Sequence, residues 1–247
     1  MEAATTSTAD PSEAPAAQPR ERARPRTGKY ARSATVDPSF SLAKHLSQTL
    51  GVAAAIAAFG VWLTLDAPTW MWALAPVFWL IANVFEWATH RHPMHKRLWP
   101  KMMYWAHTLV HHNAFAGEGA DMEIQDVRDL SVVMMPWWTL LIIFTGASPI
   151  AIAAYLIGGP GLAGVFLVSA VAYFVLYETI HTLHHLPADW LAQRSWGRSR
   201  LLAYLRHHHH HHHQLPRMSH VNFNVTFPLG DLLMGTLERP PAAPSNH

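Results

Sequence analysis

Four long hydrophobic segments, separated by polar stretches, dominate the chain between residues 46 and 180. They cover about residues 46–65, 70–87, 130–157 and 161–180. A helix needs roughly 20 predominantly apolar residues to cross a bilayer, and each segment is close to that length or exceeds it. The sequence Gly-Ala-Ser-Pro at 146–149 interrupts the third segment, so 149–157 could either span the membrane or lie in its interface. The pattern predicts an all-α integral membrane protein with about four transmembrane helices.

Short turns connect these segments in pairs, at 66–68 and at 158–161. Neither turn contains Lys or Arg, whereas basic residues precede the first hairpin at 20–44 and follow both hairpins. Those that follow are Arg91, Lys96, Arg97 and Lys101 after the first, and Arg194, Arg198, Arg200, Arg206 and Arg217 after the second. By the positive-inside rule, we expect a multi-pass protein of two hairpins with both termini facing the cytoplasm.

The two ends of the chain differ from its middle in composition. Residues 1–38 are rich in Ala, Pro, Thr, Ser and Arg and contain almost no large apolar side chains. Such a stretch cannot bury enough apolar surface to fold, so we predict a disordered N-terminal tail there. Residues 241–247 form a second predicted disordered tail. One membrane domain, 39–240, lies between them.

Composition narrows the chemistry that this domain can carry. Hydrophobic residues make up 50% of the chain and charged residues 14%, a balance typical of membrane proteins. The absence of cysteine excludes disulfides, thiolate metal ligands and iron–sulfur clusters. The net charge of +2 is small and no motif resembles a nucleic-acid-binding element, so no nucleic-acid partner is expected.

The 19 histidines of the chain fall largely into clusters. Four clusters follow or flank apolar segments: His90, His92 and His95; His107, His111 and His112; His181, His184 and His185; and the run 207–213. All four are on the predicted cytoplasmic side, and histidine is the commonest metal ligand among side chains. A lone interfacial histidine is more often an amphipathic anchor. Several clusters behind separate spans instead predict one metal site assembled from distant parts of the chain.

The spacing within the clusters fits ligation from helices. Two pairs are four residues apart and so share a helix face: His107 with His111, and His181 with His185. His90 and His95 are five residues apart, a poor alignment on a straight helix. Pro93 should end the helix before that point, so that His95 can turn back toward His90.

The order of these clusters resembles the fatty acid hydroxylase and sterol desaturase superfamily of membrane enzymes. The resemblance rests on HRxxxH at 90–95, HxxxHH at 107–112, HxxHH at 181–185, a last HxxHH, and the closing segment from Asn222-Phe223-Asn224 to Gly235-Thr236. It covers about residues 80–240, so the domain 39–240 is expected to be fatty-acid-hydroxylase-like. It implies a four-helix anchor below a cytoplasmic helical cap, in which about ten imidazoles bind two metal ions. The implied ligands are His90, His95, His107, His111, His112, His181, His185, His209, His212 and His213.

Two features depart from the family pattern. The family's second box is usually HxxHH, whereas this chain has one more residue between His107 and His111. The run of seven histidines hides the register of the last box. Counting back from Asn222 gives the box His209, His212 and His213, and a shift by one residue gives His208, His211 and His212.

The resemblance implies an oxidoreductase that hydroxylates or desaturates a lipid, either a fatty acyl chain or a sterol-like molecule. Two iron ions, with zinc as an alternative in isolated protein, and O₂ are the implied cofactor and co-substrate. Electrons would come from a separate ferredoxin, cytochrome or reductase. Glu86 and Glu178 precede histidines of their boxes by four and three residues, and we expect them to orient ligand rings. In the acidic stretch 121–129, internal salt bridges with Arg128 are preferred over a site for a substrate head group.

Two other classes of function remain as hypotheses. A histidine-rich metal-binding or transport protein without oxygenase activity would need polar or charged residues inside its spans. Residues 46–65 and 130–157 contain no Asp, Glu, Lys, Arg or His, which disfavours transport. The third class is a zinc-stabilised structural membrane protein, which only an assay of O₂ consumption or product would separate from an enzyme.

Overall fold

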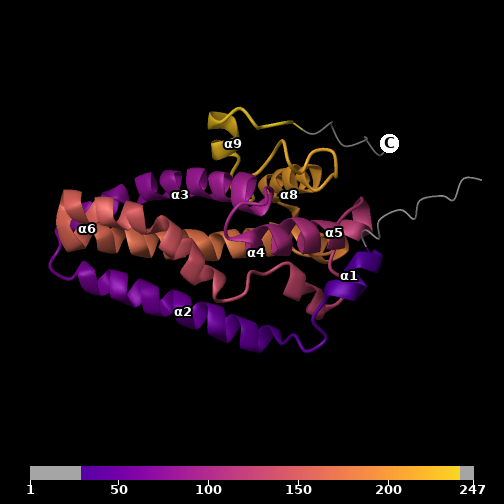
Figure 1. Cartoon of the computed structure of the whole chain (residues 1–247), viewed down its shortest axis with the longest axis horizontal. Helices are drawn as coiled ribbons and strands as arrows, with labels where there is room; N and C mark the ends of the chain where they lie inside the picture. Colours follow the sequence, from indigo (N-terminus) through magenta and orange to yellow (C-terminus); the bar gives the residue numbers. More distant parts are fainter. Residues whose placement is uncertain (1–28, 240–247) are drawn as a thin grey trace, which may run out of the picture.

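The computed structural model describes residues 29–239, and within that range the chain is helical with connecting turns and no β-strand. The all-α prediction is therefore confirmed for this range. Figure 1 shows long helices lying side by side, with shorter helices gathered toward one end. In chain order the elements are α1 (Lys29–Thr35), α2 (Leu42–Leu63), η1 (Thr69–Leu74), α3 (Ala75–Thr89), η2 (His90–Met94), α4 (Lys101–Tyr104), η3 (Trp105–His111), α5 (His112–Ala114), η4 (Gly119–Met122), η5 (Val127–Val132), α6 (Thr139–His185), α7 (Ala188–Ala192), η6 (Trp196–Arg198), α8 (Arg200–His212) and α9 (Leu229–Leu233).

Three helices in the described part of the chain are long and apolar enough to cross a membrane: Leu42–Leu63, Thr69–Met94 and Thr139–His185. The fourth predicted span and the part of the third from residue 139 onward thus belong to one element, α6, whereas residues 130–138 precede it and include the end of η5. Its helical geometry is lost at Gly158 and Gly159, and Gly159 has a φ of +69°, which glycine adopts without the strain that a side chain would cause. The chain reverses there, and the two arms of α6 pack against each other in one apolar cluster (Figure 1).

The interruption predicted at 146–149 does not appear, because α6 stays helical through Pro149. Proline lacks the N–H that would bond to the carbonyl four residues earlier, here that of Thr145. The Ser148 hydroxyl donates to this carbonyl at 2.7 Å instead. A neighbouring hydroxyl of this kind lets an apolar helix tolerate proline. Residues 149–157 therefore continue the helix.

Helices α2 and α6 approach closely at two glycines. A Cβ atom on Gly164 would lie 2.4 Å from the carbonyl oxygen of Gly60, and a Cβ on Gly60 would lie 2.9 Å from Val168 Cγ2. Both contacts are shorter than a real Cβ makes. Small residues at such a crossing let two backbones pack directly, the usual arrangement between helices in a membrane.

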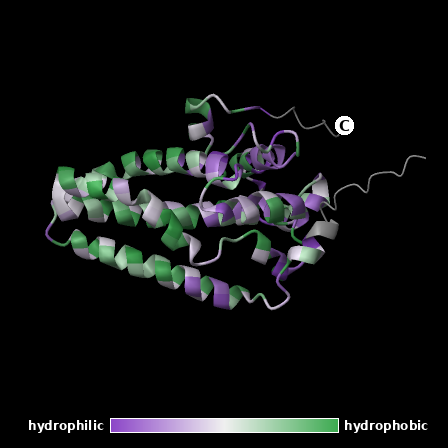
Figure 2. Ribbon diagram, viewed as in Figure 1, coloured by the Kyte–Doolittle hydropathy of each residue, from purple (hydrophilic) through white to green (hydrophobic). Residues whose placement is uncertain are grey.

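Polarity separates the molecule along its long axis. Figure 2 shows mainly hydrophobic residues on α2, α3 and α6 toward the reversal in α6, and hydrophilic residues gathered toward the other end. Large apolar side chains on these helices are exposed, among them Phe59, Trp62 and Leu156. Such surfaces suit a lipid environment, so the three apolar helices indicate association with a membrane.

Part of the predicted N-terminal tail, within residues 29–38, is folded against the rest of the domain. Residues 29–35 form α1, and the Arg32 side chain is buried beneath the segment that follows the second histidine box. It donates to the carbonyl oxygens of Ala114 (3.2 Å), Asp121 (2.5 Å) and Glu123 (2.5 Å), and to Asp129 at 3.4 Å. The prediction of disorder is therefore wrong for 29–38, because one arginine satisfies several carbonyls of a distant loop. Residues 1–28 and the predicted C-terminal tail at 241–247 lie outside the described residues.

Candidate metal centre

Histidines from all four clusters meet within the described part of the chain. Their candidate ligand atoms form two groups, and within each group the atoms lie within 4.8 Å of one another. The first group contains His90, His95, His107, His112 and His212. The second contains His111, His181, His185 and His209. The remaining predicted ligand, His213, lies between the groups: its Nε2 is 3.2 Å from that of His111, and its ring stacks on His112 with centroids 4.1 Å apart.

Two of the boxes lie in π-helical turns, whose wider coil places residues five apart on one face. The turn η2 begins at His90 and leads to His95, and the two rings stack with centroids 5.0 Å apart. The turn η3 contains His107 and leads to His112, and their Nε2 atoms are 3.0 Å apart. The wider turn thus absorbs the additional residue of the second box.

The helix end predicted before Pro93 is absent. The π-turn η2 continues through Pro93 to Met94. His95 therefore approaches His90 because the coil widens, and no break in the helix is needed. The wider turn does not use the i to i−4 bond that proline prevents.

The structure distinguishes the two registers of the last box on α8. His209 and His212 belong to the two groups, and His213 lies between them. His208 and His211 instead face carboxylates, at 3.3 Å from Asp231 and 3.1 Å from Glu238. The geometry therefore favours the register counted back from Asn222.

The second ring nitrogen, Nδ1, of several of these histidines faces a backbone carbonyl oxygen. The pairs are His90 with Phe223, His111 with Val132 (2.8 Å), His185 with Met122 (2.9 Å), His212 with Val221 (2.8 Å) and His213 with Phe115 (3.3 Å). A carbonyl oxygen can only accept a hydrogen bond, so each of these Nδ1 atoms carries the hydrogen. Each Nε2 atom is then left with a free lone pair, the form that binds a metal.

The lone pairs of neighbouring rings face one another. The Nε2 atoms of His111 and His213 are 3.2 Å apart, and both rings donate through Nδ1, so they cannot hydrogen-bond to each other. Two such lone pairs repel unless a cation lies between them. Two imidazoles on one metal at about 2.0–2.1 Å place their nitrogens roughly 2.9–3.4 Å apart. The spacing fits, so these residues are suited to hold a metal ion.

Burial keeps the imidazoles outside the spans neutral. Desolvation lowers the pKa of His95 to about 2 and the pKa of His111 to about 4, the latter partly offset by the Val132 carbonyl. The same cause lowers the pKa of His112 and His209 well below the usual value. Because metals bind neutral imidazole, these rings have no proton to lose at neutral pH before binding one.

No ligand ring donates the expected hydrogen bond to Glu86, because the Phe223 carbonyl already accepts the hydrogen of Nδ1 of His90. Glu86 is buried and accepts instead from the backbone N–H groups of Val225 (2.5 Å) and Thr226 (3.1 Å). The hydroxyls of Thr226 and Tyr173 also donate to it, at 2.7 and 2.5 Å.

Glu178 also contacts backbone and no ligand ring. Its Oε2 accepts from the backbone N–H of Met135 at 3.1 Å, in the turn before α6. Neither its Oε1 nor Nδ1 of His181 has a hydrogen-bond partner among the described residues. The prediction that both carboxylates orient rings directly is therefore wrong.

One segment, 221–226, connects the carboxylates to the rings. Carbonyls of its alternate residues face histidines: Val221 faces His212, Phe223 faces His90 and Val225 faces His184. The N–H groups of residues 223 and 224 donate to the buried Asp231 at 2.8 Å each, and those of 225 and 226 donate to Glu86. Two buried carboxylates thus hold the segment whose carbonyls orient the rings.

Two further histidines of the boxes are outside the two groups. His184 is buried, its Nε2 lies 2.9 Å from the Val225 carbonyl, and its ring stacks on His209 with centroids 4.9 Å apart. His92 lies against the Trp87 ring. Neither is a member of either group: His184 packs on His209 of the second group, and His92 packs on Trp87.

A family comparison agrees with this arrangement. The model of the family described as fatty acid hydroxylase matches residues 75–236, which include every histidine of both groups. The chain belongs to the fatty acid hydroxylase family. No curated protein and no solved structure matches it. Membership confirms the resemblance seen in the sequence, and it implies that the protein is an oxidoreductase.

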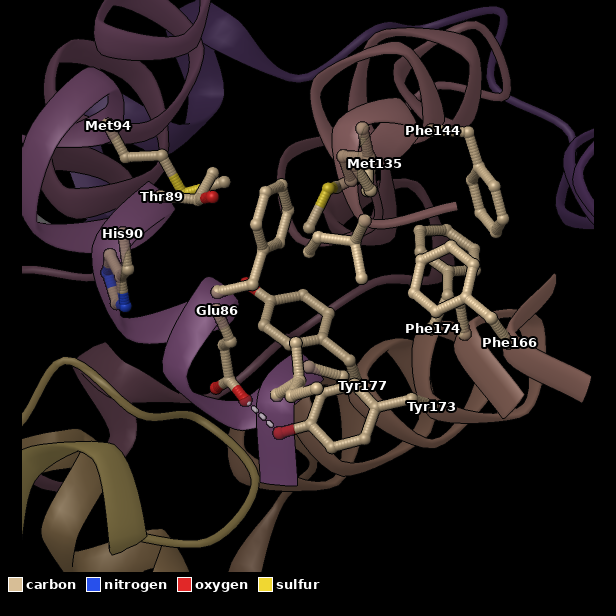
Figure 3. A pocket seen from close by; sticks show the side chains of 17 residues that line it. Glu86, Thr89, His90, Met94, Met135, Phe144, Phe166, Tyr173, Phe174 and Tyr177 are labelled. Carbon is tan, nitrogen blue, oxygen red and sulfur yellow. Dashed lines mark hydrogen bonds between the residues drawn. The ribbon is translucent and has the colours of Figure 1, made fainter. Parts of the chain in front are cut away.

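An apolar cavity of the protein reaches the first histidine group. It lies between α3 and the two arms of α6, and its walls include Phe85, Phe144, Phe166 and Phe174. Its lining also includes Glu86, Thr89, His90 and Tyr173 (Figure 3). Figure 3 also shows Met94 and Met135 pointing into the same space from different elements.

A second cavity reaches the centre from another side. It is lined by His107, His111 and His181 at the centre, and by residues 131–136 and the α4–η3 segment farther out. Met94, Met135 and Tyr177 line both cavities. These three side chains therefore separate two spaces that meet beside the histidines of the metal centre.

Two residues that support the histidine groups, Asn83 and Asp231, were not predicted from the sequence. Asn83 donates to Tyr173 Oη at 2.8 Å and to the Phe227 carbonyl at 2.8 Å, and its Oδ1 accepts from Gly230 N at 2.7 Å. The position of Asn83 could have indicated such a role, because an amide inside an apolar span needs hydrogen-bond partners. Asp231 lay within the closing family segment, but no spacing rule gave its role.

The acidic stretch 121–129 forms salt bridges, as preferred from the sequence. Asp126 pairs with Arg128 at 2.9 Å on the surface, and Asp129 pairs with the buried Arg32 at 3.4 Å. Glu123 pairs with Arg206 at 2.7 Å. These three carboxylates form ion pairs within the protein, which favours a structural role over binding of a substrate head group.

Proposed function

We propose that the protein is a membrane-bound, O₂-dependent di-iron oxidoreductase that hydroxylates or desaturates a lipid. The observation that carries the proposal is the convergence of ten imidazole Nε2 atoms beside an apolar cavity. Five of these rings have their lone pairs directed by backbone carbonyls. Two groups of five and four ligands, with His213 between them, suit two metal ions.

The ligand set supports a redox metal. It consists of neutral imidazoles with no thiolate, and imidazole suits iron as well as zinc and copper. When bound, two iron ions with O₂ would supply the oxidising power for an unactivated C–H bond, which side chains cannot provide. The protein residues position the rings, keep them neutral and exclude bulk water.

The substrate proposed is a lipid chain, because the cavity that ends at His90 has almost entirely apolar walls. Phenylalanine side chains from α3 and α6 would hold an acyl chain or sterol-like body. Met94, Met135 and Tyr177 would fix the reacting carbon beside the two histidine groups. Hydroxylation and desaturation start from the same hydrogen abstraction, and the proposal includes both.

The remaining parts of the proposal concern topology and electrons. The distribution of Lys and Arg supports a cytoplasmic location for the histidine groups and both termini. Two electrons per turnover would come from a separate ferredoxin, cytochrome or reductase that docks on that side.

Metal analysis and lipid mass spectrometry test the proposal. Purified protein should contain about two iron ions per chain, and membranes of cells that express it should contain a hydroxylated or desaturated lipid that control cells lack. His111→Ala and His185→Ala should abolish iron binding and product. His220→Ala, at an exposed histidine outside both groups, is the matched control and should retain both. Full iron content and activity in the first two variants would refute the proposal.

A further inference from the structure

A basic and aromatic segment joins η2 to η3. Residues 96–105, which we call the basic–aromatic segment, have the sequence Lys-Arg-Leu-Trp-Pro-Lys-Met-Met-Tyr-Trp. Lys96, Arg97 and Lys101 are exposed. So are the large apolar side chains between them: Leu98 is 47% exposed, Trp99 88%, Met102 45% and Trp105 61%. Large apolar groups this exposed indicate a contact surface for something other than water.

The positive charge of this segment is not neutralised locally. The sequence contains no Asp or Glu between Glu86 and Glu118. None of the ion pairs found within residues 29–239 involves Lys96, Arg97 or Lys101. Arg97 lies over the Tyr104 ring at 5.5 Å, which leaves its charge uncompensated, so the segment offers three cations without an acidic partner to an anionic ligand.

The position of the segment suits a membrane interface. The apolar helix Thr69–Met94 ends two residues before Lys96. Figure 1 shows α4, which begins at Lys101, next to the end of α3. Tryptophan gathers at the head-group level of bilayers, and Lys and Arg beside a span attract acidic lipids.

The segment also borders the second cavity. Met102 and Trp105 line that cavity while their side chains remain partly exposed, and His107, His111 and His181 line it at the metal centre. The cavity thus extends from the basic–aromatic segment to the histidines. A lipid chain that enters beside Trp105 would pass directly toward the centre.

We propose that the basic–aromatic segment binds the acidic head group of a membrane lipid whose acyl chain enters through the second cavity and reaches the first cavity where the two meet, beside Met94, Met135 and Tyr177. The inference rests on the proposed function and adds to it, since it gives the substrate class as a lipid with an anionic head group. A membrane lipid fits better than an acidic protein, because the exposed Leu98 and Trp99 alternate with the cations at the end of a span.

Native mass spectrometry of the purified protein in neutral detergent tests this site. The probes are phosphatidylglycerol and phosphatidylcholine with identical acyl chains. The wild-type protein should retain phosphatidylglycerol preferentially. The triple variant Lys96→Gln, Arg97→Gln, Lys101→Gln should lose that preference, with affinity for phosphatidylglycerol falling about tenfold or more, since each cation near a lipid surface contributes appreciably. Binding of phosphatidylcholine should not change.

The control removes the same charge elsewhere. Lys44→Gln, Arg198→Gln, Arg200→Gln neutralises three exposed basic residues outside the segment and should leave phosphatidylglycerol binding intact. A second variant, Ala106→Trp, fills the cavity wall without changing charge. It should weaken retention of long-chain phosphatidylglycerol but leave dihexanoyl phosphatidylglycerol bound.

Two outcomes would overturn the inference. If the Lys96, Arg97 and Lys101 variant binds phosphatidylglycerol like the wild type, the head-group site does not exist. If it instead loses binding of an acidic electron-transfer protein while keeping phosphatidylglycerol, the surface serves a protein. Lipid retention requires neither turnover nor an electron donor, so iron content and product formation judge the proposed oxidoreductase activity separately.

Discussion

At the scale of single residues, the orientation of the imidazoles depends on which atom receives each Nδ1 hydrogen. Backbone carbonyls accept it at His111, His185 and His212. Replacing the side chain of the residue that carries such a carbonyl does not remove the carbonyl. The position of the carbonyls therefore depends on what holds the backbone. For 221–226 this is Glu86 on one side and Asp231 on the other.

Replacing Glu86 tests this indirect positioning. Glu86→Gln keeps the shape of the side chain but turns one acceptor oxygen into an amide that faces the donors of Val225, Thr226 and Tyr173. We expect iron affinity to fall about 10–100-fold, as is typical when groups that orient metal ligands are changed. Competition with a chromogenic chelator measures this.

The control for that experiment is Glu118→Gln, which changes an exposed carboxylate outside the centre. It should leave iron affinity unaltered. An unchanged affinity in Glu86→Gln would show that the 221–226 segment holds its position without this carboxylate.

At the scale of elements, the π-turns determine which histidines share a face. In η3 the wider coil brings His107 and His112 together although they are five residues apart. An α-helical turn would instead align residues four apart. The π-turn thus accommodates the additional residue of the second box and keeps His107 and His112 on one face.

Deletion of Val110 tests the role of η3. The shortened box would have the spacing HxxHH, which an α-helical turn accommodates, and His107 would rotate away from the first group by about 100°. We expect the variant to lose about one of two iron ions, measured by inductively coupled plasma mass spectrometry. Retention of two iron ions would mean that the turn adapts without the additional residue.

The crossing of α2 and α6 gives a second prediction at this scale. Gly164→Leu would place a side chain against the Gly60 carbonyl and force the helices apart. We expect a loss of roughly 1–3 kcal/mol in stability, the usual cost of overpacking. Thermal unfolding in detergent would measure it, and Gly51→Ala, where no atom lies within 4 Å of the added Cβ, should have little effect.

At the scale of the whole molecule, the N-terminal helix and the histidine core are joined by one buried side chain. Arg32 binds the carbonyls of the 114–123 loop, pairs with Asp129 and lies over the Phe115 ring at 4.5 Å. Phe115 in turn contacts His111 and His185. The loop that covers the second group is therefore fastened by a residue far away in the sequence.

Arg32→Ala should release that loop. Removing one partner of a buried ion pair typically costs about 3–5 kcal/mol, here moderated because Asp129 also accepts from backbone N–H groups. We expect faster proteolysis within 113–129, measured by limited digestion. We also expect a lower melting temperature, measured by scanning calorimetry. Arg128→Ala, in an exposed pair, is the control. Equal protection in both variants would contradict the role assigned to Arg32.

The helical class, the apolar segments and the histidines that meet could all be predicted from the sequence, because these depend on periodicity, length and residue chemistry. The sequence did not determine the path of α6 through Pro149, the π-turns or the end of the N-terminal tail. Arg32 is a partner distant in sequence for the 114–123 loop. The π-turns depend on a choice between backbone geometries of similar energy. At Pro149, the neighbouring Ser148 hydroxyl takes the Thr145 carbonyl that the proline cannot bond.

The carboxylates show the same division. The spacing of Glu86 and His90 placed both on one helix face, but only the tertiary structure brings the 221–226 segment between them. A carbonyl more than a hundred residues away then takes the ring hydrogen, and the carboxylate takes the N–H groups of the same segment. Sequence spacing cannot reveal this, because every residue has the same backbone donor and acceptor and only the fold decides which of them face a side chain.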